Sequence, residues 1–206
     1  MPNQTDQIVF GFGRIAALLR AGQWQAGSGA ALNPAQAEIL TRIANRPMRP
    51  GDLAAHLGVS PASLSDSVSS LISKGLAARQ RDAQDGRARL VVATEDGKAL
   101  AETLPSAPED FQAALDALPE SERASLLRTL VHLIRALQQA RAIPVQRMCA
   151  TCRHFRPHAH IDAARPHHCA FVNAAFGDAD LRLDCDDHDE VQEEEAAAIW
   201  RRLTAA

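Results

Sequence analysis

The sequence predicts a mainly α-helical protein with one small β-hairpin and a cysteine-rich segment near its C-terminal end. Three observations support this class. Apolar residues recur at helical spacing over most of the first 142 residues. Residues 77–93 change to the alternation of period two that is typical of paired strands. All four cysteines of the chain lie between Cys149 and Cys185.

Composition narrows the classes of protein further. The N-terminus has no basic leader followed by a long apolar core, and nowhere do about 18 apolar residues follow one another, so we expect a cytoplasmic protein without membrane association. Thiols stay reduced in that compartment, which favours metal binding over disulfides. The net charge of −3 is uneven: residues 1–146 carry 15 basic and 14 acidic side chains, and residues 147–206 carry 7 and 11.

The elements follow in order from the N-terminus. Helices are expected over residues 6–23 and from Pro34, which Asn33 would cap. A short helix over 51–57 ends at Gly58, and a second one begins after a Ser60 cap, with Leu64, Val68, Leu71 and Ile72 as its buried stripe.

Strands are expected over 77–81 and 89–93, joined by a turn with an Asp-Gly signal. Thr94 then caps a helix, and further helices are expected over 111–118 and from about 120 to 142. A short helix, a glycine turn, a capped second helix and a hairpin together predict a winged helix-turn-helix. In that arrangement the second helix enters the major groove of DNA.

Small hydroxyl side chains dominate the outward face of the second helix, which suits phosphate contacts and water-mediated readout. No Lys or Arg stands there for a guanine contact, so we expect modest base specificity. Phosphate contacts would instead come from arginines of the hairpin and depend on salt. The predicted DNA-binding residues are Ser60, Ser63, Ser65, Ser67, Arg79, Arg81, Arg87 and Arg89. The alternative is a winged helix that serves as a protein-interaction module.

Two stretches, LAAHLGVSPASLSDSVSSLISKGL and RDAQDGRARLVVATEDGKAL, resemble the MarR family of bacterial regulators. The matching positions of the wing are Asp85, Arg87, Thr94 and Gly97, and the resemblance covers about residues 5–142. It implies a homodimer formed by the first and last helices, with Arg87 in a minor groove and Asp85 holding its guanidinium. A narrow minor groove concentrates negative potential and attracts arginine. The chain departs from the family at Gly86, which is often basic, and in its cation-poor recognition helix.

The resemblance and the cysteines together predict four segments. These are an N-terminal dimerisation helix (1–32), the winged helix-turn-helix (33–104), C-terminal dimerisation helices (105–144) and a Cys/His-rich metal-binding extension with an acidic terminal helix (145–206).

The cysteines follow the pattern C-x₂-C-x₁₆-C-x₁₅-C, and we predict that Cys149, Cys152, Cys169 and Cys185 bind a metal. One pair and two single cysteines are closer to iron–sulfur spacings, whereas structural zinc is common, so an iron–sulfur cluster and Zn²⁺ both stay open. His154 and His188 stand near cysteines and are alternative ligands, hydrogen-bond partners of the ligands or surface residues.

The function predicted from these features is a homodimeric transcription regulator, a repressor, on a pseudo-palindromic double-stranded operator. Its DNA affinity would change with the metal or cluster. One alternative keeps DNA binding but makes the zinc purely structural, with a small-molecule effector as the signal. The other is a thiol–disulfide enzyme that uses Cys149 and Cys152, which no catalytic triad, phosphate loop or paired-carboxylate cleft supports. The chain is therefore expected not to be an enzyme.

Overall fold

The protein divides into two compact units, Met1–Asp116 and Ala117–Ala206. The structure, a computed structural model, describes residues 3–28, 31–82, 85–105 and 107–205. The boundary between the units falls inside the segment 105–144 that the sequence suggested as one dimerisation region. Because the longest C-terminal helix belongs to the second unit, it shares that unit with the cysteines.

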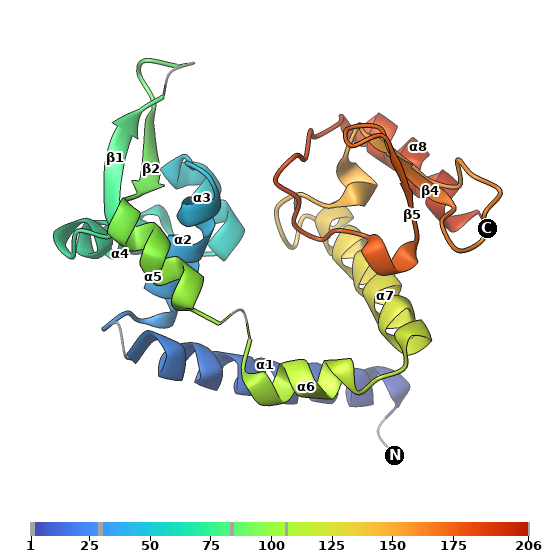
Figure 1. The fold of residues 1–206 in the computed structure, drawn as a ribbon, viewed down its shortest axis with the longest axis horizontal. Helices are drawn as coiled ribbons and strands as arrows, with labels where there is room; N and C mark the ends of the chain where they lie inside the picture. Colours follow the sequence, from blue (N-terminus) through green and yellow to red (C-terminus); the bar gives the residue numbers. More distant parts are fainter. Residues whose placement is uncertain (1–2, 29–30, 83–84, 106, 206) are drawn as a thin grey trace. The chain divides into compact units, whose positions relative to one another are not determined.

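The first unit is helical except for its hairpin (Figure 1). Its elements are α1 (Gln4–Ser28), α2 (Pro34–Asn45), α3 (Pro50–Leu57), α4 (Pro61–Ser73), β1 (Ala77–Arg81), β2 (Arg89–Ala93), α5 (Glu95–Thr103) and α6 (Glu109–Asp116). The apolar faces of α2, α3, α4 and α5 meet the two strands in one core, whose largest fully buried members include Ile39, Leu40, Ile43, Leu53 and Leu71. The predicted mainly helical fold with a β-hairpin wing is confirmed.

The helix caps explain where these helices begin and end. Asn33 and Gln36 form a reciprocal capping box at the start of α2. Gly58 ends α3 in the left-handed conformation, with φ of 62°, which a residue without a Cβ adopts without strain. The Ser60 hydroxyl accepts a hydrogen bond from the Ser63 N–H at the start of α4. The predicted turn between α3 and α4 is thus confirmed.

The two strands form the wing. β1 and β2 are antiparallel, with Ala77 opposite Ala93 and Arg81 opposite Arg89. The backbone of Met48 bridges to Val91, which joins the wing to the segment before α3. The predicted hairpin turn includes residues 83–84, which lie outside the described residues.

Gly97 has a packing role that the sequence pattern did not reveal. The Thr94 hydroxyl accepts from the Gly97 N–H at 3.0 Å and donates to the Gly75 carbonyl at 2.7 Å. This brings α5 so close to the turn before β1 that a Cβ on Gly97 would stand 2.0 Å from the Leu76 carbonyl oxygen. The Thr–x–x–Gly pattern therefore fixes α5 against the base of the wing.

Replacing Gly97 by alanine should lower the free energy of unfolding of the first unit by about 1–3 kcal/mol, because the backbone at Leu76 must move. Gly51→Ala is the matched control, since nothing lies within 4 Å of a Cβ there and the residue is helical. Urea unfolding followed by circular dichroism measures both. Equal stabilities of the two variants would contradict this role of Gly97.

The second unit packs α7 (Glu120–Gln139) and α8 (Glu193–Thr204) with the cysteine segment. Between them lie η1 (Cys149–Thr151), β3 (Phe155–Arg156), β4 (His167–Cys169), β5 (Ala174–Phe176) and η2 (Asp178–Asp180). The strands form an antiparallel sheet in the order β3-β4-β5, which the sequence pattern did not predict. The predicted acidic terminal helix begins at Glu193, and the backbone before it is extended, with Glu190 bridging to Cys152.

Two adjacent faces of α7 have different surroundings. Val131 is fully buried, and Leu127 and Ile134 pack against the core of the second unit. Leu126, Leu133 and Leu137 of the same helix are exposed. Thus α7 contributes one apolar face to the cysteine unit and presents another on the surface of the chain.

Every helix within the described residues is too short or too polar to span a membrane.

Candidate DNA interface and four-cysteine site

The predicted residues at the recognition helix α4 lie outside its buried stripe. Leu64, Val68 and Leu71 face the core, whereas Ser63 and Ser65 are exposed and Ser67 is half-buried. The Ser60 hydroxyl is already engaged at the helix start, where it also donates to the Ser63 hydroxyl at 3.0 Å. This face is therefore small, polar and uncharged apart from Asp66.

The positive charge of the candidate DNA interface lies on the wing. Arg79, Arg81, Arg87 and Arg89, the wing arginines, are all exposed, and the structure shows no ion pair for any of them within the described residues. Arg81 stands directly opposite Arg89, and like charges in that position repel one another. Arg79 and Arg89 also line a cavity of about 270 Å³ together with Ser65 of α4. This arrangement favours an anionic partner that spans the wing and the recognition helix.

The tip of the wing is connected to the start of α3. The guanidinium of Arg49 bonds the Asp82 carboxylate at 2.7 Å and lies 3.8 Å from that of Asp85. The hydrogen bond with Asp82 raises the pKa of Arg49. The Asp85 carboxylate accepts from the backbone N–H of Arg87 at 3.1 Å, so its observed contact is with the Arg87 backbone. That the Asp85 carboxylate positions the Arg87 guanidinium in the minor groove stays a prediction.

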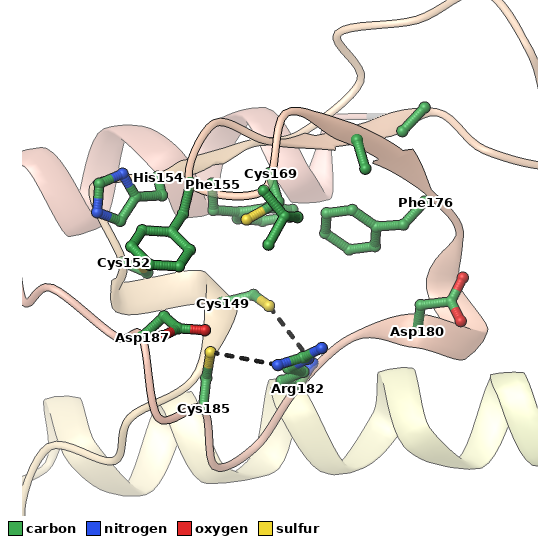
Figure 2. Close-up of a pocket in the computed structure, with 14 residues that line it drawn as sticks. Cys149, Cys152, His154, Phe155, Cys169, Phe176, Asp180, Arg182, Cys185 and Asp187 are labelled. Atoms are coloured by element: carbon green, nitrogen blue, oxygen red, sulfur yellow. Dashed lines mark hydrogen bonds between the residues drawn. The ribbon is translucent and has the colours of Figure 1, made fainter.

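The four cysteines converge on one cavity although they come from three separate parts of the second unit. Cys149 and Cys152 lie at the two ends of the η1 turn, Cys169 ends β4, and Cys185 follows η2. Figure 2 shows the side chains of Cys149, Cys169 and Cys185 around this space. The structure thus brings together the four residues that the sequence singled out as metal ligands.

This four-thiol cavity has a volume of about 330 Å³ and largely apolar walls. Phe155, Phe171 and Phe176 form part of the wall, and Phe155 belongs to the buried core. Burial raises the pKa of the Cys149 thiol to about 11, although a hydrogen bond from the Arg182 backbone opposes this shift.

Arg182 is the residue of this site that the sequence pattern did not single out. Its backbone N–H donates to the Cys149 sulfur at 3.4 Å, and its guanidinium donates to the Cys185 sulfur at 3.7 Å (Figure 2). The pKa of Arg182 is raised, with the hydrogen bond to Cys185 as the largest cause. Its position three residues before Cys185 is the one sequence signal that could have indicated this role.

Histidines surround the site in different ways. His154 lines the four-thiol cavity, whereas the His188 ring nitrogen Nε2 lies 3.0 Å from the Thr151 hydroxyl. His167 is fully buried and pairs with the Asp178 carboxylate at 2.9 Å, which connects β4 to η2. Within the described residues, no three His, Cys, Asp or Glu side chains are placed to hold one metal ion.

Comparison with known proteins agrees with the fold of the first unit. Residues 32–88 match the sequence model of the MarR family. Among solved structures, MepR of S. aureus in a DNA-binding conformation has a TM-score of 0.57 at 22% identity, over 64% of this chain and 98% of that one. The transcriptional regulator SlyA has a TM-score of 0.56 at 24% identity, over 65% and 95%.

A third structure, CouR from Rhodococcus jostii RHA1 bound to p-coumaroyl-CoA, has a TM-score of 0.51 at 22% identity, over 70% of this chain and 98% of that one. No curated protein matches the chain. At these identities the structural likeness concerns the fold, and about a third of this chain has no counterpart in the three structures. Residues 32–88 thus match the MarR family model, and the first unit has the winged helix-turn-helix fold of these structures.

Proposed function

We propose that this chain is a homodimeric, sequence-specific DNA-binding repressor whose operator affinity depends on a metal or iron–sulfur cluster held by its four cysteines. The observation that carries the DNA-binding part is the wing, where four exposed arginines lack acidic partners among the described residues. DNA phosphates would neutralise the repulsion between Arg81 and Arg89. Serines of α4 would then contact phosphates and base edges in the major groove.

Dimerisation would use the exposed apolar side chains of two helices, α1 and α7. On α1 these are Ile8, Val9, Phe10, Phe12, Ile15, Leu18 and Trp24, and on α7 they are Leu126, Leu133 and Leu137. Exposed apolar surface of this kind is typical of a protein–protein interface. A second copy of the chain is the partner that a pseudo-palindromic operator requires.

The double substitution Phe12→Glu and Ile15→Glu should convert the dimer to a monomer, because it places two carboxylates in the proposed apolar interface. Sedimentation velocity measures the change, and Arg202→Glu, an exposed position on α8, controls for added negative charge. A double variant that still sediments as a dimer would exclude this part of α1 from the interface.

The proposed route from the cysteines to DNA begins in the second unit. Because α7 packs on the same core as Met148, Ala150 and Cys152, a change at the four-thiol cavity alters the support of α7. If α7 also forms the dimer, we expect its position to affect the distance between the two recognition helices. That distance must match half-sites about one helical turn apart.

Selection from a random library of duplex DNA tests the DNA-binding function. The full chain should enrich a pseudo-palindrome with half-sites about 10 base pairs apart. Its affinity should fall steeply with salt, since the arginines replace condensed counterions. Failure to enrich any sequence would contradict the proposal.

A small-molecule effector with a purely structural metal is the second candidate. The observation that favours it is the structure of CouR with bound p-coumaroyl-CoA. In this version emptying the four-thiol cavity lowers stability but leaves the operator affinity of the folded protein unchanged. The two candidate functions therefore predict different operator affinities for folded protein whose four-thiol cavity has been emptied.

A further inference from the structure

We infer that the four-thiol cavity binds a polynuclear iron–sulfur cluster and not a single zinc ion. This inference rests on the metal site of the proposed function and specifies what the site holds. Three observations support it: the cavity that the thiols line, the groups that surround them and their places in the fold.

The arrangement of the thiols is the first argument. Zinc holds four thiolates at about 2.3 Å, which places the sulfurs about 3.8 Å apart around one ion. Here the four cysteines, together with other residues, line a cavity of about 330 Å³. Within the described part of the chain no three potential ligands are arranged for one ion. Thiols around a wide space instead fit a group that has several metal atoms and is bound by four thiolates.

The surroundings of the cavity are the second argument. Arg182 donates hydrogen bonds to the sulfurs of Cys149 and Cys185 at 3.4 and 3.7 Å. Phe155 and Phe176 provide apolar walls. Hydrogen bonds to sulfur and an apolar surrounding are features by which proteins tune iron–sulfur clusters. The guanidinium also offsets negative charge on a thiolate-bound cluster.

The positions of the ligands in the fold are the third argument. The four thiols come from η1, the end of β4 and the segment after η2, so a cluster would connect these three parts. The single Cys169 and Cys185 lie far along the chain from the Cys149–Cys152 pair, as in iron–sulfur proteins that combine close and distant cysteines.

Anaerobic reconstitution of the full chain tests the inference. One sample receives ferrous iron and sulfide, and a second receives zinc chloride alone. We expect the first to bind at least two irons per chain with a matching amount of acid-labile sulfide and to show the visible absorption of a cluster. One zinc per chain in the second sample, with no retained iron or sulfide in the first, would overturn the cluster.

DNA selection on the same samples separates the two hypotheses. A zinc-loaded protein that enriches an operator and rejects iron and sulfide overturns only the cluster. A protein that binds the cluster but enriches no DNA, with or without the cluster, contradicts the proposed regulator and supports the cluster.

Two variants locate the cluster. Cys185→Ser should lose most of the bound iron, whereas His154→Ala, which also changes the cavity lining, should retain it. Wild-type iron and sulfide in Cys185→Ser would contradict the four-thiol assignment.

A third variant, Arg182→Gln, keeps all four thiols, so the cluster is not lost through a missing ligand. It should bind the cluster with a lower reduction potential, because a nearby cation is removed. An unchanged potential would contradict the placement of the cluster beside Arg182.

Discussion

Replacing Arg87 by alanine is expected to weaken operator binding by roughly 5- to 150-fold, which corresponds to about 1–3 kcal/mol. Arg87 is exposed, follows the wing tip and has its backbone fixed by Asp85 at 3.1 Å. A guanidinium at this position can enter a narrow minor groove, where the negative potential is concentrated. Fluorescence anisotropy with the selected operator at one fixed salt concentration measures the loss.

Arg202→Ala is the matched control, because it removes the same charge from an exposed position on α8. It should leave operator affinity within about twofold, since distant exposed charges are screened by salt. Equal losses in the two variants would mean that net charge decides binding and would contradict a specific role of Arg87. An unchanged affinity in Arg87→Ala would exclude the wing tip from the interface.

Loading the four-thiol cavity is expected to stabilise the second unit by at least about 3 kcal/mol, which raises its unfolding midpoint by roughly 12–24 °C. The unit has an apolar core of its own, but Cys152 belongs to that core and Cys149 packs against it. A group that binds all four thiols therefore connects the parts on which the core depends. Differential scanning calorimetry of loaded and emptied protein under anaerobic conditions measures the shift.

Cys169→Ser should abolish most of this stabilisation, because one of the four ligands is lost. His160→Ala is the control, since His160 is exposed on the same unit and does not line the cavity. Equal midpoints for loaded and emptied wild-type protein would contradict the metal site. A full loading effect in Cys169→Ser would remove that residue from the ligand set.

The fold of the first unit could be predicted in detail because its signals are local. Asn33, Gly58 and Ser60 determine helix ends through their own backbone or side-chain hydrogen bonds. The strands 77–81 and 89–93 follow from a change of period within the chain. The resemblance to the MarR family rests on this same region, where residues 32–88 match the family model.

The second unit was less predictable because its contacts are not local. The strands of β3-β4-β5 have only two or three residues each, too few for a periodic pattern. The backbone just before α8 pairs Glu190 with Cys152, which is distant in sequence. The cysteine pattern indicated a shared site, but the role of Arg182 depends on contacts that only the fold creates.

The dependence of operator affinity on the four-thiol cavity is the central claim, and one titration tests it most directly. The selected operator is titrated with cluster-loaded protein and with protein emptied by a chelator, at the same salt concentration and with folding checked by circular dichroism. We predict dissociation constants that differ by at least about tenfold, a coupling free energy of about 1.4 kcal/mol. Equal dissociation constants for two folded forms would contradict regulation through the cysteines.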